Sequence, residues 1–186
     1  MTETTQRGSG AFRSDDELIR AVKADQRCFE AIYLKYVKQV YRYLFSRMGS
    51  QFEAEDATAQ TFLSALEGIT RYRHDGHFAA WLFAIARRKA ADHFRTAGKS
   101  RFLPDDLPSF DPDLLTQTIR AERLTELREC IRGFGEEEQE LLRLRFAAQL
   151  TYAEIARLTE RKEDAVKKSV YRLLDRMQSR LEESHD

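Results

Sequence analysis

Basic and aromatic side chains gather near the C-terminus in a spacing that suits contact with DNA. Apolar residues between 165 and 174 recur at helical intervals, so the polar residues between them should lie on the outer face of a helix. These outer residues are Lys162, Lys167, Lys168, Tyr171 and Arg172. A shorter helix should precede them, because Thr151 and Glu154 form a capping-box pair. Together the two helices predict a helix-turn-helix motif.

The chemistry open to this motif is contact with phosphates and base edges in a major groove. The start of the second helix should read bases, which singles out Lys162, Glu163 and Lys167. Lys168 and Arg172 should contact phosphates. The alternative is an ordinary helical hairpin with solvated lysines, and three acidic residues between positions 160 and 164 favour it.

A second basic segment lies between residues 87 and 101, where six Lys or Arg residues accompany one acid, Asp92. Phosphates need countercharge and unstacked bases need an aromatic platform, so this segment and nearby aromatics suit single-stranded DNA. Phe78, Trp81 and Leu82 are equally explained as core packing, and the basic residues as a solvated face. The whole chain balances 31 basic against 31 acidic residues, which argues against histone-like binding but not against local patches.

The sequence contains no recognisable set of catalytic residues. No P-loop, nucleophile–base pair or metal-ligand spacing occurs, and His74, His77 and His93 have no cysteine beside them. We therefore expect no catalytic residue, no metal, no cofactor and no small-molecule substrate. Cys28 and Cys130 are isolated and should be buried thiols in a reducing compartment. Because no apolar run has membrane-spanning length, we expect a cytoplasmic protein without membrane insertion.

The elements that must position these residues are helices, because Pro and Gly are scarce and apolar residues keep helical spacing. We predict an all-α protein of two small helical domains joined by a flexible linker. Residues 1–13 should be a disordered tail, and residues 14–97 an N-terminal helical bundle whose first helix is capped by Ser14. Residues 29–48 should form a long helix that stops near Gly49.

Composition changes after residue 97. Residues 98–118 hold all three prolines and no apolar periodicity, so they should be a linker. Residues 119–183 should form a four-helix domain that ends in the helix-turn-helix. Its first helices should bury Leu124, Leu127 and Ile131, then Leu141, Leu142, Leu144 and Phe146.

Three stretches together resemble bacterial sigma factors of the small extracytoplasmic-function subfamily. EAEDATAQTFLSALEGI (53–69) and FAAWLFAIARRKAADHFR (78–95) are similar to that family's core-binding and promoter-melting segments, and residues 150–174 to its second domain. The positions that match the first two segments are Glu55, Asp56, Gln60, Thr61, Phe62, Leu63, Trp81, Leu82, Ile85, Ala86, Arg87, Asp92 and Arg95. Departures are Arg88, where the family often has Asn, and Glu160, where it often has Gly.

This resemblance implies three binding surfaces. Core RNA polymerase would contact Glu55, Asp56, Gln60, Phe62 and Leu63. The minus-ten promoter element would contact Arg71, Tyr72, Arg73, His77, Phe78, Trp81, Arg87, Arg88, Lys89 and Arg95. The minus-thirty-five element would contact Thr151, Tyr152, Arg161, Lys162, Glu163, Lys167, Lys168, Tyr171 and Arg172.

The expected function is therefore transcription initiation, with core RNA polymerase, promoter DNA and an anti-sigma factor as partners. Two rival hypotheses stay open. An operator-binding regulator would bind DNA without polymerase and would need a symmetric dimer, for which no dimerisation coiled coil is evident. A protein-binding adaptor, such as an anti-sigma scaffold, would leave the lysines solvated.

Overall fold

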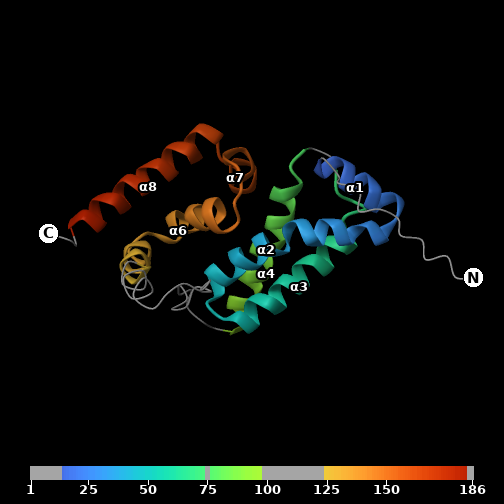
Figure 1. Ribbon diagram of the computed structural model, residues 1–186, viewed down its shortest axis with the longest axis horizontal. Helices are drawn as coiled ribbons and strands as arrows, with labels where there is room; N and C mark the ends of the chain where they lie inside the picture. Colours follow the sequence, from blue (N-terminus) through green and yellow to red (C-terminus); the bar gives the residue numbers. More distant parts are fainter. Residues whose placement is uncertain (1–13, 74–75, 98–123, 184–186) are drawn as a thin grey trace, which may run out of the picture.

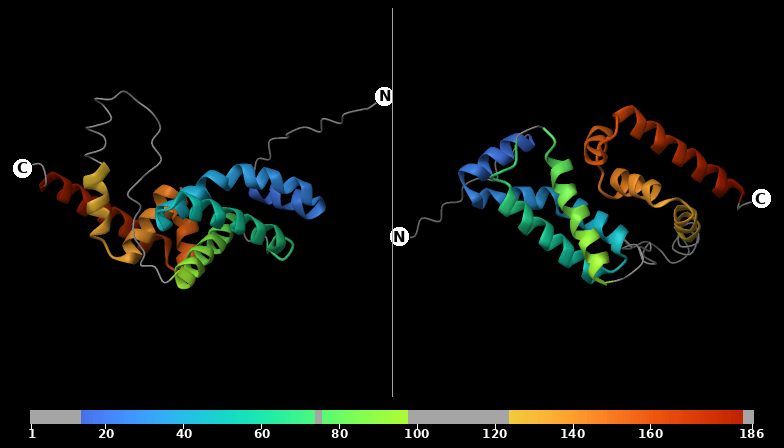
Figure 2. Two further views of the ribbon diagram at one scale, coloured as in Figure 1. Left: turned by 90° about the horizontal axis from the view of Figure 1, so that it is seen from below. Right: turned by 180° about the vertical axis from the view of Figure 1, so that it is seen from behind.

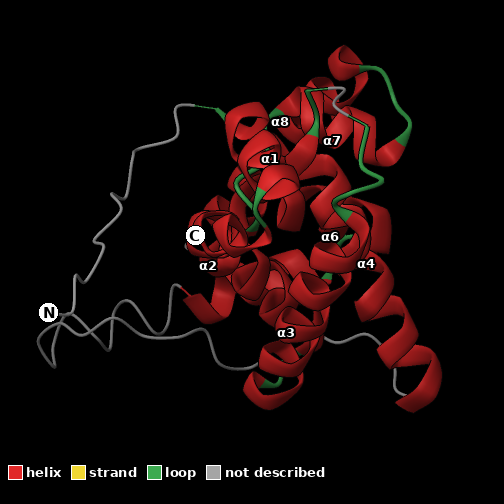
Figure 3. Ribbon diagram, turned by 90° about the vertical axis from the view of Figure 1, so that its right-hand side faces the viewer, coloured by secondary structure: helices red, strands yellow, loops and turns green. Residues whose placement is uncertain are grey.

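The computed structural model describes residues 14–73, 76–97 and 124–183, and every regular element within them is helical (Figure 3). The all-α prediction is confirmed. The predicted tail and linker, together with residues 119–123, lie outside the described residues, so the proposed domain boundaries stay predictions. None of the described helices is long and apolar enough to cross a bilayer.

The N-terminal bundle consists of α1 (Asp15–Ala24), η1 (Gln26–Cys28), α2 (Phe29–Met48), α3 (Gln51–Gly68) and α4 (Phe78–Ala97). Ser14 caps α1 by accepting a hydrogen bond from the Glu17 amide at 3.3 Å, as predicted. Gly49 ends α2 with φ of 79°, also as predicted. Ser50 caps α3, which therefore begins at Gln51 rather than at Glu53.

Apolar side chains from all four long helices fill the core of this bundle. The largest fully buried ones include Ile19, Ile32, Leu44, Phe78 and Phe83. Tyr33 shares the helical spacing of the apolar residues of α2 but is exposed, and Cys28, which was predicted to be a buried thiol, is only half-buried. The core fixes α3 and α4 beside α2, so their outward faces are rigidly presented.

The C-terminal bundle contains a helical segment (124–132), α6 (Glu136–Leu142), the π-helix η2 (Arg143–Ala147), α7 (Tyr152–Thr159) and α8 (Glu163–Glu183). Thr151 and Glu154 form the predicted capping box at the start of α7. Leu144, Leu150, Ile155, Val166 and Val170 are fully or almost fully buried. Three residues with apolar spacing, Leu124, Phe146 and Ala165, are exposed instead of buried. Phe146 lies in the π-helix η2, and on α8 the neighbouring Val166 takes the core position instead of Ala165.

The two bundles pack against each other. Figures 1 and 2 show the C-terminal bundle along one side of the N-terminal one, with α8 on the outside. α7 contacts α4, and η2 contacts α2. The junction therefore brings the helix-turn-helix next to the basic helix α4.

Candidate functional site

The predicted DNA-reading face of α8 is open to solvent. Lys162, Glu163, Lys167, Lys168, Tyr171 and Arg172 are all exposed, while Val166 and Val170 hold the opposite face in the core. This agrees with the predicted orientation of the helix, and contact with DNA stays a prediction.

The remaining minus-thirty-five candidates support this face. Tyr152 lies half-buried, with its ring 6.4 Å from that of Tyr171 and the guanidinium of Arg145 at 4.8 Å. Arg161 donates to the Ser169 hydroxyl at 2.8 Å, and Thr151 is occupied as the cap of α7. Arg145 was not singled out from the sequence, since its stacking on Tyr152 depends on the turn between η2 and α7.

The predicted minus-ten residues fall into a buried and an exposed group. Tyr72, Phe78 and Trp81 form an aromatic cluster with ring centroids 5.1 to 5.5 Å apart. Tyr72 and Phe78 are buried and Trp81 is half-buried, so packing covers most of the surface that bases would need for stacking. Arg71 and Arg73 are exposed in the loop before α4, and His77 is half-buried.

The basic residues of α4 point in different directions. The side chain of Arg88 is 84% exposed, and Arg95 pairs with Asp92 at 3.0 Å on the solvent side. Lys89 is half-buried. Arg87 instead turns toward the C-terminal bundle, where it donates to the backbone oxygen of Leu158 at 3.2 Å. Arg87 is therefore occupied within the protein.

The predicted polymerase-docking residues lie on α3, and four of the five are exposed. Glu55, Asp56, Gln60 and Leu63 face solvent, and the Gln60 amide donates to Asp56 at 2.6 Å. Phe62, however, is only 4% exposed. It packs edge-to-face on Phe29 and Tyr33, with ring centroids 6.4 and 4.9 Å away, so it supports α3 from inside.

Further apolar side chains extend this surface. Leu63 is 58% exposed and Phe52 is 81% exposed, each on α3. On the exposed face of α3 these two side chains would add apolar contact area to a protein-binding surface. Phe52 was not predicted from the sequence. An exposed phenylalanine and a buried one look alike in a sequence, and only the structure shows that Phe52 lies on the solvent side of α3.

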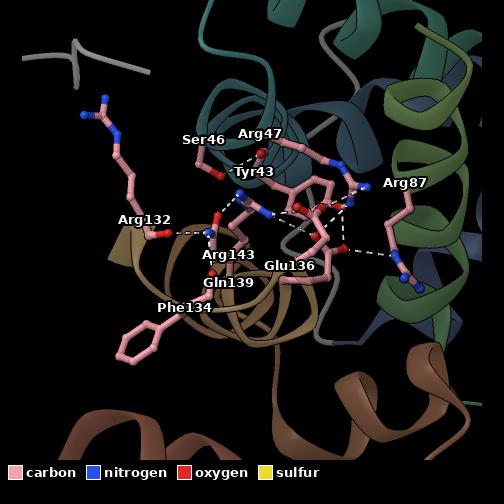
Figure 4. Close-up of polar contacts among 10 residues, drawn as sticks. Tyr43, Ser46, Arg47, Arg87, Arg132, Phe134, Glu136, Gln139 and Arg143 are labelled. Atoms are coloured by element: carbon pink, nitrogen blue, oxygen red, sulfur yellow. Dashed lines mark hydrogen bonds and ion pairs between the residues drawn. The ribbon is translucent and has the colours of Figure 1, made fainter. Parts of the chain in front are cut away.

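A charged cluster joins the two bundles, and Figure 4 shows its side chains converging from α2, α4, α6 and η2. We call it the bridging cluster; its members are Tyr43, Arg47, Arg87, Glu136, Glu140 and Arg143. Glu140 is 7% exposed and lies at its centre. The Glu140 carboxylate accepts from the Tyr43 hydroxyl at 2.8 Å and from Arg47 Nη1 at 2.7 Å. Arg87 Nε lies 3.0 Å from it and Arg143 Nη1 lies 3.7 Å from it.

Burial shifts the pKa values of three side chains in the bridging cluster. Burial raises the pKa of the Tyr43 phenol and Glu140 raises it further, so the hydroxyl stays protonated and donates. Burial opposes the charge of Arg47, but Tyr43 and Glu140 outweigh it and raise the pKa of that guanidinium. Burial lowers the pKa of the Arg143 guanidinium, while Glu140 and Glu136 oppose that shift, and an arginine side chain is not deprotonated in proteins. Three cations therefore share the central carboxylate.

The C-terminal bundle also carries an apolar groove of about 430 Å³. Its lining includes Leu124, Leu127, Ile131, Phe146, Leu174 and Met177. Leu124, Leu127, Ile131 and Phe146 were predicted to be core residues, but Leu124 and Phe146 are exposed and Leu127 and Ile131 are half-buried. The groove is therefore an accessible surface rather than part of the core.

Comparison with known proteins assigns both bundles to one family. Residues 32–100 match Sigma-70 region 2, and residues 124–177 match Sigma-70, region 4. The chain is 35% identical over 172 residues to the ECF RNA polymerase sigma factor BldN of Streptomyces coelicolor, a match that covers 88% of this chain. The chain spans 64% of that relative's length.

Two further known proteins are similar to this chain and support the same family. The chain is 32% identical over 157 residues to the "Probable RNA polymerase sigma-C factor" of Mycobacterium bovis, covering 78% of this chain and 82% of that protein. The sigma factor RpoE of Bartonella quintana, solved with the anti-sigma factor NepR, has a TM-score of 0.64 at 18% identity over 83% of this chain and 96% of that one. This second likeness concerns the fold. The chain belongs to the extracytoplasmic-function subfamily of RNA polymerase sigma factors.

Proposed function

We propose that this chain binds core RNA polymerase in the cytoplasm and directs promoter recognition, DNA melting and transcription initiation without catalytic chemistry of its own. One observation carries the proposal: a sigma region 2 bundle with an exposed acidic and apolar α3 occurs in one chain with a region 4 bundle whose basic α8 face is open. Each contact alone would be weak. Placing both on one chain would make the second effectively intramolecular.

Run-off transcription with purified core polymerase on a genomic fragment library tests this function. We expect discrete transcripts that appear only when the chain is added. A Lys167→Ala, Lys168→Ala variant should lose most of them, because both side chains are exposed on α8. Glu182→Ala, exposed at the far end of α8, is the matched control and should retain them. Footprints on DNA without polymerase, from a dimer in gel filtration, would instead favour an operator-binding regulator.

An anti-sigma protein is the proposed second partner. The apolar groove of the C-terminal bundle supports it, since a groove lined by Leu, Ile, Phe and Met side chains suits an amphipathic helix. The structurally similar Bartonella protein was solved with an anti-sigma factor. Affinity purification from the native cell under non-inducing conditions should recover a small stoichiometric partner. Recovery with core polymerase alone would contradict this partner.

A further inference from the structure

A side chain of the first helix holds the chain segment that follows α3. Lys23 Nζ donates a hydrogen bond to the backbone oxygen of Tyr72 at 2.8 Å, although the two residues lie 49 positions apart in the sequence. Figure 1 shows α1 beside the chain that leads into α4. Tyr72 lies between Arg71 and Arg73, two exposed residues that were predicted to contact minus-ten DNA. Lys23 therefore fixes the backbone from which both arginines project.

The other parts of Tyr72 are held by contacts that do not involve Lys23. The Tyr72 ring is buried, with its centroid 5.5 Å from that of Phe78 and 5.1 Å from that of Trp81. The Tyr72 amide donates to the backbone oxygen of Ile69 at 3.2 Å. Loss of the Lys23 ammonium would therefore free the Tyr72 carbonyl while the ring and the turn stay packed.

Helix α1 is a firm base for this bond. Near its start, Asp15 accepts a hydrogen bond from the Tyr36 hydroxyl of α2 at 2.6 Å. Its apolar face is buried in the core through Leu18, Ile19 and Val22. Lys23 itself lies in the last turn of α1 and is exposed, so its side chain is not needed for that packing. A charged donor such as its ammonium also makes a stronger hydrogen bond than a neutral one.

We propose that Lys23 is a positioning residue for the minus-ten contact, which acts by holding the Tyr72 backbone so that Arg71 and Arg73 meet the melted strand from fixed positions. Ordering long side chains and loops on binding costs conformational entropy, and a backbone that is fixed beforehand lowers that cost. The ammonium of Lys23 is occupied by the Tyr72 carbonyl, so Lys23 acts on DNA through the two arginines. The proposal rests on the proposed function and on the predicted minus-ten role of Arg71 and Arg73.

The first test measures promoter melting by the complex with core polymerase, on a promoter identified by run-off transcription with the wild type. Lys23→Met removes the donor, and Lys23→Arg keeps a charged donor. Arg20→Met is the matched control, because Arg20 is an exposed cation of the same helix whose Nε donates to the Asp16 carbonyl at 3.1 Å. Permanganate reactivity of unpaired thymines should show melting about tenfold slower with Lys23→Met, since two arginines must then be ordered on binding. Lys23→Arg and Arg20→Met should melt the promoter at nearly the wild-type rate.

The second test separates a positioning role from a direct phosphate contact. The probe is a fluorescent single strand that carries the non-template minus-ten sequence of the same promoter, bound by the polymerase complex at several salt concentrations. Positioning predicts that Lys23→Met weakens binding about equally at every salt concentration, so that the log–log slope is unchanged. A slope lowered by about 0.7, as the loss of one phosphate contact to a single strand requires, would overturn the positioning role.

The remaining measurements separate failure of this inference from failure of the fold or of the function. Circular dichroism should be the same for the wild type and all variants, and hydrogen exchange should become faster in residues 70–73 of Lys23→Met but not in α1. Faster exchange throughout α1 would assign Lys23 a purely structural role. If Lys23→Met does not fold, Lys23→Gln, which also lacks the charge, replaces it with the same expected losses. Wild-type transcription together with unimpaired melting by Lys23→Met would overturn this inference alone, whereas absence of wild-type transcripts would overturn the sigma function.

Discussion

At the scale of single residues, Glu160 has the most unusual backbone in the helix-turn-helix. It ends α7 with φ of 55° and ψ of 36°, the left-handed conformation that L residues with a Cβ atom adopt at a cost of about 1 kcal/mol. We predict that Glu160→Gly raises the free energy of unfolding by roughly 0.5–1 kcal/mol, because glycine takes this conformation without that cost. Urea denaturation followed by circular dichroism measures the change.

Glu160→Ala is the control for this substitution. It removes the same carboxylate but keeps the Cβ atom, so the backbone strain remains and no gain in stability is expected. Equal stabilisation by alanine and glycine would assign the effect to charge instead, since Glu160 lies one residue before Arg161 and near the acids Glu163 and Asp164.

At the scale of elements, α3 carries the proposed polymerase contact. Asp56→Ala combined with Gln60→Ala should weaken binding to core polymerase by several-fold while leaving circular dichroism unchanged, because both side chains are exposed and the Gln60 amide donates to Asp56 instead of to the core. Pull-down of core polymerase measures the loss. Glu67→Ala, exposed near the end of the same helix, should bind as the wild type does. Unimpaired pull-down by the double variant would exclude this face of α3.

Helix α8 carries the proposed promoter contact. Lys168 is exposed in the second turn, so Lys168→Ala should weaken promoter binding by the polymerase complex modestly and lower its log–log salt slope by about 1, as the loss of one phosphate contact requires. Anisotropy titrations at several salt concentrations measure the slope. Gln178→Ala, exposed near the C-terminal end of α8, should leave it unchanged. An unaltered slope for Lys168→Ala would refute the phosphate assignment.

Periodicity and capping residues were sufficient to predict these elements but not their partners. The caps at Ser14 and Thr151 and the outer face of α8 were all predicted, because each depends on residues within a few positions of one another. The contacts of Arg87 were not predicted, because its partners Glu140 and Leu158 lie 53 and 71 residues away in the chain. Glu140 was not singled out from the sequence. The spacing of residues along a helix predicts which face is polar, but the contacts of that face with distant parts of the chain are known only from the fold.

At the scale of the whole molecule, the bridging cluster should make the two bundles unfold together. Tyr43 and Arg47 of α2 bond directly to Glu140 of α6, and Arg87 of α4 bonds to α7, so loss of either bundle leaves buried charges of the other unpaired. We predict a single calorimetric transition for the wild type, with equal calorimetric and van't Hoff enthalpies.

Glu140→Gln should split this transition into two, one for each bundle, because each bundle has buried apolar side chains of its own, such as Ile19 and Phe83 in one and Leu144 and Ile155 in the other. Glu137→Gln should keep the single transition, since its exposed carboxylate is not one of the members of the bridging cluster. Two transitions in the wild type would mean that the bundles are thermodynamically independent and that the junction is too weak to couple them. A single transition in Glu140→Gln at a lower temperature would instead assign the coupling to the apolar contacts of α7 with α4 and of η2 with α2.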